Sequence, residues 1–147
     1  MSEQVTDSPV PWVSNHMKEY LETGGRKGHE WRPGVPTLLL TTTGRRSGVK
    51  RRTALIYGHD TDRYVVVASQ GGAPEHPAWY LNLEADPDVE VQVMDDVFPA
   101  RAETATGAER TRLWALMRSI WPAYDEYQTK TDREIPVVVL TRSTSAG

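Results

Sequence analysis

The sequence predicts a mostly β domain with peripheral helices, an α+β chain whose strands form a small barrel. Short runs of apolar and β-branched residues recur along the chain between turn residues, which is typical of strands. Helical periodicity is limited to a few segments beside these runs. With 147 residues, the chain is long enough for one domain with a substantial core.

A strand, a basic turn and a returning strand form the centre of the chain. Leu38–Thr43 is apolar and then β-branched, and Thr53–Tyr57 is apolar and aromatic again. Gly44 and Gly48 bracket the turn. Five of the eight residues in Arg45–Arg52 are cationic, and such a density of like charge favours an anion-binding site. A solvated hairpin with a charged tip is equally consistent with the pattern.

Composition and spacing exclude several other kinds of site. There is no Cys, and the four His are far apart in the sequence, so we expect no disulfide and no metal site. The spacing of Gly44, Gly48 and Lys50 does not fit a Walker loop. A net charge of −3 argues against a protein that coats nucleic acid. No apolar run is long enough to span a membrane.

The composition changes along the chain and divides it into four expected segments. We expect a disordered N-terminus over 1–10, an amphipathic helix over 11–25, the barrel domain over 26–142 and a flexible tail over 143–147. Gly24-Gly25 ends the helix. The helix is expected to pack on the barrel. Weak association with a membrane surface through residues 11–23 is the alternative.

The remaining elements follow in chain order. Strands are expected over Arg63–Ser69, Val89–Met94, Val97–Ala102 and Ile135–Thr141, and helices over Pro77–Ala85 and Gly107–Ile120. Thr106 and Glu109 have the spacing of a capping box at the start of the second of these helices. Trp121, Tyr124 and Tyr127 follow its end, where we expect a loop that carries an aromatic wall.

Six motifs, taken together, resemble the deazaflavin-dependent nitroreductase family of actinobacteria. In chain order they are Thr-Thr-Thr-Gly-Arg-Arg-Ser-Gly, Val-Ala-Ser-Gln-Gly-Gly, Pro-Ala-Trp-Tyr-Leu-Asn-Leu, Asp-Pro-Asp-Val-Glu-Val, Trp-Pro-Ala-Tyr-Asp-Glu-Tyr-Gln and Thr-Asp-Arg-Glu-Ile-Pro-Val-Val-Val. The resemblance implies a split β-barrel of the pyridoxamine-phosphate-oxidase and FMN-binding type. It also implies an F420H2-dependent reductase of the nitroreductase or quinone reductase type. In such an enzyme, a hydride passes from reduced coenzyme F420, a deazaflavin with an anionic tail, to a quinone-like or nitroaromatic acceptor.

The resemblance also assigns roles to individual residues. Catalytic positions are implied at Ser69, Tyr124 and Tyr127, and substrate-binding positions at Trp121, Tyr124 and Tyr127. Because Trp121 stands where the best-known nitroreductase of the family has tyrosine, we expect a narrower acceptor pocket. Cofactor-binding positions are implied at Arg45, Arg46, Ser47, Arg51, Arg52, Thr53, Ala54, Leu55, Ile56, Val67, Ala68, Ser69, Gln70, Ala78, Trp79, Tyr80, Leu81, Asn82 and Tyr124.

Three other functions compete with this hypothesis. An F420-binding carrier without turnover would use the same hairpin, and an FMN-binding reductase would use the same barrel. A nucleic-acid module could use the cationic turn, but no stacking aromatics lie beside it in the sequence. We expect a small-molecule electron acceptor as the partner, no nucleic acid and no required protein partner. The expected location is the cytoplasm, with a peripheral position on the inner face of the plasma membrane as the alternative.

Overall fold

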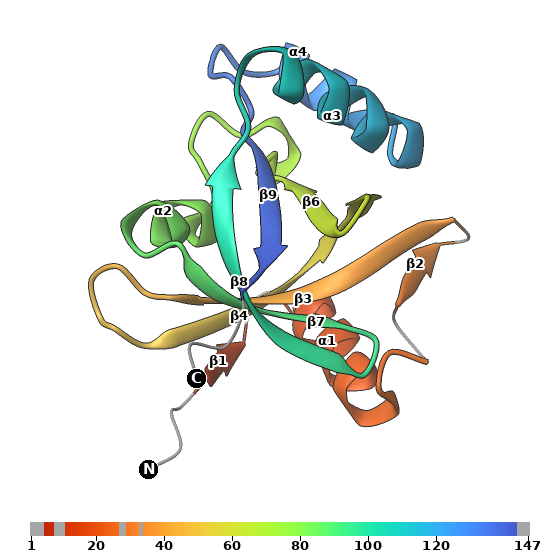
Figure 1. Cartoon of the computed structure of the whole chain (residues 1–147), viewed down its shortest axis with the longest axis vertical. Helices are drawn as coiled ribbons and strands as arrows, with labels where there is room; N and C mark the ends of the chain where they lie inside the picture. The colour runs from red at the N-terminus through yellow and green to blue at the C-terminus, as the bar shows by residue number, and fades with distance from the viewer. Residues whose placement is uncertain (1–4, 8–10, 27–28, 33, 144–147) are drawn as a thin grey trace.

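The structure, a computed structural model, describes residues 5–7, 11–26, 29–32 and 34–143 (Figure 1). Its strands are β1 (Val5–Asp7), β2 (Glu30–Arg32), β3 (Val35–Thr43), β4 (Lys50–Ile56), β5 (Gly58–Asp60), β6 (Arg63–Val67), β7 (Asp88–Val93), β8 (Asp96–Thr104) and β9 (Val137–Arg142). Its helices are α1 (Pro11–Thr23), α2 (Ala78–Ala85), α3 (Gly107–Ile120) and α4 (Ala123–Thr129), with a short 3₁₀ turn η1 (Gln70–Gly72).

The strands pair in the order β1-β4-β3-β7-β8-β9-β6-β5, and β2 pairs with β3. β1 runs parallel to β4, whereas the other described pairs are antiparallel. Cα atoms of β4 and β6 approach within 8 Å of each other, so the sheet curls into a half-open barrel. The helices lie around this barrel, with α3 and α4 together at one end (Figure 1). The prediction of a mostly β chain with peripheral helices is confirmed.

Alternation along the strands gives the barrel an inner and an outer apolar layer. Leu38 and Leu40 belong to the inner core, whereas Leu39 faces α1. On β6, Val66 points inward, and its neighbours on both sides point toward α3 and α4. The described residues therefore form three packed clusters, one inside the barrel, one under α3 and α4, and one under α1.

The N-terminal helix forms where its pattern predicts it. Met17 and Tyr20 are fully buried against Leu39 of β3. The helix ends because the N–H of Gly25 donates to the carbonyl of Tyr20 at 2.8 Å, with Gly25 at φ +83°. A Cβ atom on Gly25 would lie 2.3 Å from Cα of Met94, so this position requires glycine. Packing of α1 on the barrel is confirmed.

Two features of the hairpin region differ from the prediction. Val5–Asp7, expected to be disordered, forms β1 along β4, because the backbone groups at that edge of the sheet would otherwise lack partners. Residues 1–4 and 8–10 lie outside the described part of the chain, as do residues 144–147 of the expected tail. The basic turn is also shorter than expected, since Lys50–Arg52 already belongs to β4.

Two predictions at α3 and α4 are wrong. The aromatic segment after α3 is a helix rather than a loop; Pro122 at its N-cap and two acidic residues in its first turn favour helix initiation. Thr106 is the N-cap of α3, but its side chain makes no capping hydrogen bond. The expected capping box does not form at this helix, and Glu109 lies instead 3.5 Å from Arg63.

Candidate functional site: a cationic hairpin and an aromatic wall

The cationic end of the site is the turn between β3 and β4. Gly48 adopts φ +72°, and its N–H donates to the carbonyl of Gly44 at 2.9 Å. Arg45 and Arg46 stand on this turn with exposed side chains, and Arg51 is exposed on the adjoining strand. Like charges held this close together in water favour an anionic ligand.

Asn82 connects the turn to α2. Its side chain is 5% exposed. Its Oδ1 accepts a hydrogen bond from the N–H of Arg45 at 3.1 Å, and its Nδ2 donates to Oγ1 of Thr42 at 3.3 Å. The predicted cofactor residues of α2 and of the hairpin are thereby brought together. Tyr80 is a different case, because it is buried in the barrel core with its hydroxyl 2.9 Å from Oγ1 of Thr104.

The turn after β6 is strained and tightly packed. Gln70 adopts φ +46°, a conformation that is unfavourable for residues other than glycine. Gly72 adopts φ +84°, and a Cβ atom there would lie 2.7 Å from the carbonyl oxygen of Tyr127. Ala68 and Ser69, which precede the turn, are buried. The Val67–Gln70 segment is predicted to contact the deazaflavin ring. It leads into a turn with a fixed backbone conformation that packs against α4.

Arg133, which the sequence prediction missed, holds this turn. Its guanidinium donates to the carbonyls of Ala68, Ser69 and Ala73 at 3.2, 2.7 and 2.9 Å, and lies 3.0 Å from Nδ1 of His76. Partial burial lowers the pKa of this arginine from its ordinary value. A single arginine before a strand forms no recognisable functional pattern. The sequence signal for its role is that it belongs to the motif Thr-Asp-Arg-Glu-Ile-Pro-Val-Val-Val.

The aromatic wall is part of the second core cluster. Tyr124 is 4% exposed, and its ring meets that of Tyr127 edge to face at 6.1 Å. Nε1 of Trp121 donates to the Tyr127 hydroxyl at 3.3 Å. Burial raises the pKa of the Tyr124 phenol. Within the described part of the chain, no hydrogen bond reaches the Tyr124 hydroxyl.

The predicted residues on β4 do not share one face. Ile56 packs with the cluster that contains Val67, Trp121, Tyr124 and Tyr127, so five predicted site residues from three separate segments meet there. The other predicted β4 residues lie elsewhere: Leu55 packs toward the barrel interior, Ala54 packs toward α1, and Thr53 is half-buried. Side chains of Thr53–Ile56 cannot all reach one ligand.

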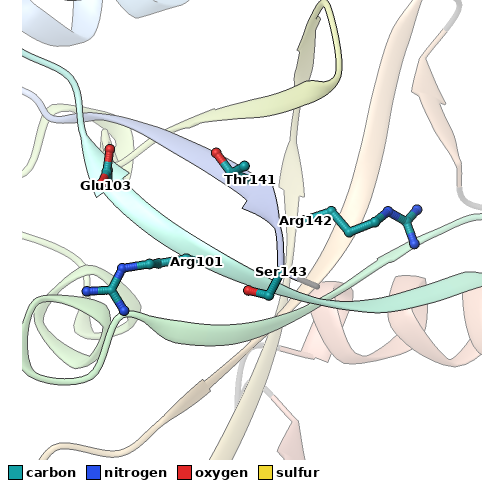
Figure 2. Close-up of a pocket in the computed structure, with 5 residues that line it drawn as sticks. All are labelled: Arg101, Glu103, Thr141, Arg142 and Ser143. Atoms are coloured by element: carbon teal, nitrogen blue, oxygen red, sulfur yellow. The ribbon is translucent and has the colours of Figure 1, made fainter. Parts of the chain in front are cut away.

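A separate hollow of about 440 Å³ lies on the outer surface of β8 and β9 (Figure 2). Its lining consists of Arg101, Glu103, Thr141, Arg142 and Ser143. The exposed residues Arg101 and Glu103 alternate with Ala100 and Ala102 of the inner core, so this hollow opens away from the barrel interior. None of the predicted site residues lines it.

Neither a metal-binding cluster nor a membrane-spanning helix is found among the described residues. No group of three or more His, Asp or Glu side chains that could hold a metal occurs among the described residues. In the same part of the chain, no helix is both long enough and apolar enough to cross a membrane.

The curled antiparallel sheet with its peripheral helices defines the class of fold, a split β-barrel. Structures with low sequence identity share this fold. They include the heme storage protein HutZ of Vibrio cholerae (15% identity, TM-score 0.60, 90% of this chain and 92% of that one). A putative pyridoxamine 5'-phosphate oxidase of Listeria innocua is also similar (11% identity, TM-score 0.52, 74% and 84%). The split-barrel prediction is confirmed.

The model of the F420H2-dependent quinone reductase family matches residues 12–142, and the chain belongs to this family. A relative in Mycobacterium tuberculosis, named as an F420H2-dependent quinone reductase, is 43% identical over 130 residues, which are 86% of this chain and 87% of the relative. A structure titled F420-H2 dependent reductase (FDR-A) is 47% identical with a TM-score of 0.67, over 71% and 93% of the chains. A structure described as a domain-swapped dimer is 42% identical with a TM-score of 0.70, over 90% and 99%. This chain is therefore an oxidoreductase that uses coenzyme F420.

Proposed function

We propose that this chain reduces a quinone, with the coenzyme lying between the cationic hairpin and the aromatic wall. The observation that carries the proposal is the connection between these two ends. Asn82 joins α2 to the hairpin. Arg133 holds the segment that precedes α2, and Gln128 of α4 in turn holds the carbonyl of Arg133. Coenzyme F420 has an anionic tail and a flat ring, and the two ends of the site fit these two parts.

The hairpin binds the tail in this proposal. Arg45, Arg46 and Arg51 are exposed on one turn and the strand that follows it. Guanidinium groups bind phosphate and carboxylate through paired hydrogen bonds. Ser47 is already used within the turn, because its Oγ accepts from the N–H of Val49 at 3.1 Å. We therefore assign the anionic tail to the arginines and a structural role to Ser47.

The wall receives the ring and the acceptor. When bound, the reduced deazaflavin supplies a hydride. Trp121 and Tyr127 offer aromatic faces for stacking. Ser69 lies just before η1, because β6 ends at Val67 rather than at Ser69 as the sequence predicted. The Tyr124 phenol is protonated at neutral pH, as an ordinary tyrosine is, and burial raises its pKa further. Its hydroxyl can therefore donate a hydrogen bond to an oxygen that gains negative charge.

An anaerobic assay with reduced coenzyme F420 tests the proposal. The purified chain is mixed with the reduced coenzyme and a small quinone, and the return of the oxidised coenzyme's absorbance is followed. Acceptor-dependent oxidation is expected. Binding of the coenzyme without turnover would indicate a carrier, and a purified protein that carries FMN would indicate the FMN-binding alternative.

Trp121 supports a preference for slim acceptors. Its indole is half-buried and hydrogen-bonded to the Tyr127 hydroxyl, so the larger ring has a fixed place in the wall. We expect turnover of small quinones and poor turnover of bicyclic nitroimidazoles. The Trp121→Tyr variant should narrow this difference. Efficient reduction of a bicyclic nitroimidazole by the wild-type chain would contradict the proposal.

We further propose that the chain works in the cytoplasm and that α1 contacts lipid only weakly. Met17 and Tyr20 of α1 are already buried against the barrel, which leaves less apolar surface for a membrane. The side chains of Trp12 and Val13 lie outside the described part of the structure. Pelleting with anionic vesicles should recover little protein, whereas strong binding that is lost in salt would indicate a membrane anchor.

A further inference from the structure

Arg133 lies between α4 and β9, and its guanidinium reaches a segment about sixty residues earlier in the chain. Its hydrogen bonds to Ala68, Ser69 and Ala73 all end on main-chain carbonyl oxygens. Because an arginine side chain can only donate, these bonds use most of its donor capacity. One side chain thus fixes both ends of the turn that contains Gln70.

The backbone that carries Arg133 is itself held by α4. Nε2 of Gln128 donates to the carbonyl of Arg133 at 2.8 Å, and Oε1 of Gln128 accepts from the N–H of Ile135 at 3.0 Å. Gln128 lies one residue after Tyr127, whose carbonyl leaves no room for a side chain at position 72. The helix that carries Tyr124 and Tyr127 therefore also carries Gln128, the residue that holds the backbone of Arg133.

The same guanidinium selects a tautomer of His76. Its contact with Nδ1 is 3.0 Å long, and because arginine can only donate, Nδ1 must be the acceptor. The neutral imidazole then carries its proton on Nε2. The ring is also fixed by Tyr80, whose centroid is 4.9 Å away. Arg133 thus positions a side chain as well as a turn.

We propose that Arg133 is a positioning residue for the coenzyme, which holds Ala68–His76 in the conformation that accepts the deazaflavin ring. The inference rests on the proposed coenzyme site. The strained φ of Gln70 supports it, since a strained turn needs such bonds to persist. Without Arg133 the turn relaxes, and its contact surface for the ring is lost while the barrel stays folded.

The Arg133→Lys variant tests this inference, because lysine keeps the positive charge but cannot reach four acceptors at once. We expect the Kd for coenzyme F420 to rise at least tenfold, and the absorption spectrum of the bound coenzyme to change. Hydrogen exchange of the amides at 70–73 should speed up. Arg110→Lys is the matched control, since Arg110 donates to the carbonyl of Ile135 at 2.7 Å and pairs with Glu134. It should lower stability without changing the Kd.

An unchanged Kd and spectrum in folded Arg133→Lys would overturn the inference. If that variant does not fold, Gln128→Ala decides, because it loosens the backbone of Arg133 and leaves the guanidinium intact. We expect its Kd to rise about threefold, and a wild-type Kd would overturn the inference. Failure of the wild-type chain to bind the coenzyme would instead refute the proposed site itself.

Discussion

Tyr124 at the aromatic end of the site is 4% exposed and packs among core residues, whereas Arg45 and Arg46 at the cationic end are exposed on a turn. The aromatic end is held by helix packing and by the hydrogen bonds of Arg133. The cationic end is connected to α2 by the buried side-chain amide of Asn82. The aromatic end is thus part of the hydrophobic core, whereas the cationic end lies outside the core and is connected to α2 through Asn82.

This difference determines how each end can be tested. A core residue contributes to the free energy of unfolding as well as to binding, so its deletion mixes two effects. An exposed charge contributes little to stability and can be removed cleanly. Substitutions at the wall should therefore move stability first, and substitutions at the hairpin should move affinity first.

The largest effect is expected from Tyr124→Ala. Removing a buried aromatic ring leaves a cavity under α4, and we expect a loss of about 3–5 kcal/mol in the free energy of unfolding. Tyr124→Phe keeps the ring and removes a hydroxyl that has no hydrogen bond within the described chain, so its stability should stay near wild type. A fall in quinone turnover for Tyr124→Phe would then report on proton donation alone. Urea unfolding and steady-state assays measure the two quantities, and wild-type stability of Tyr124→Ala would place the residue outside the core.

Combined removal of Arg45 and Arg51 should show the opposite behaviour. The double alanine variant should weaken coenzyme binding by roughly 2–3 kcal/mol, or about 30- to 150-fold, and make the Kd less dependent on salt. Its melting temperature should stay near wild type because both side chains are exposed. Arg101→Ala with Arg118→Ala removes the same charge at exposed ion pairs elsewhere. If this control weakens binding equally, net charge rather than the hairpin attracts the coenzyme.

Much of the contrast between the two ends could be read from local sequence. The hairpin follows from glycine spacing, charge density and the alternation of Leu38–Leu40, which are all local signals. The helix at 123–129 was missed because aromatic residues spaced by three after a proline suggested a loop. Pro122 followed by Asp125 and Glu126 was the local signal for that helix.

Other features of the site are not local. Arg133 bonds to carbonyls more than sixty residues away in the sequence, and no spacing rule predicts such a contact. The burial of Tyr124 depends on how α4 docks on β6 and β9. Leu55 alternates with Ala54 and Ile56 as a strand predicts, but Ala54 joins the cluster under α1 and Ile56 joins the cluster under α3 and α4, which depends on where these helices pack along the sheet.

Asn82 allows the attachment of the hairpin to be tested directly. Asn82→Ala removes two hydrogen bonds from a buried site, so we expect a loss of roughly 1–3 kcal/mol in unfolding free energy and weaker coenzyme binding. Thr42→Val is the matched variant, because it removes the bond to Nδ2 and leaves the bond between Oδ1 and the N–H of Arg45. It should lower stability and keep the coenzyme Kd. Equal loss of affinity in both variants would show that general packing, not the anchoring of Arg45, matters at this end.

The smallest effect is expected at Asp60, the last residue of β5, which is not among the predicted site residues. Its carboxylate is 12% exposed and binds Arg112 at 2.8 Å and Arg63 at 2.6 Å. These hydrogen bonds hold the pKa of Asp60 well below its ordinary value. The unfolded chain therefore takes up the proton first, so the stabilisation is fully present above about pH 4 and is lost as the pH falls through the lower, folded-state pKa.

Asp60→Asn should lower the melting temperature by roughly 2–4 °C at neutral pH, and its difference from wild type should shrink as the solution becomes acidic. Asp88→Asn is the control, because the pair of Asp88 with Arg101 is long, at 3.5 Å, and exposed. Its melting temperature should follow wild type at every pH. Coenzyme affinity at neutral pH should be unchanged in both variants, since neither touches the hairpin. A difference between Asp60→Asn and wild type that grows in acid would contradict the assigned direction of the pKa shift.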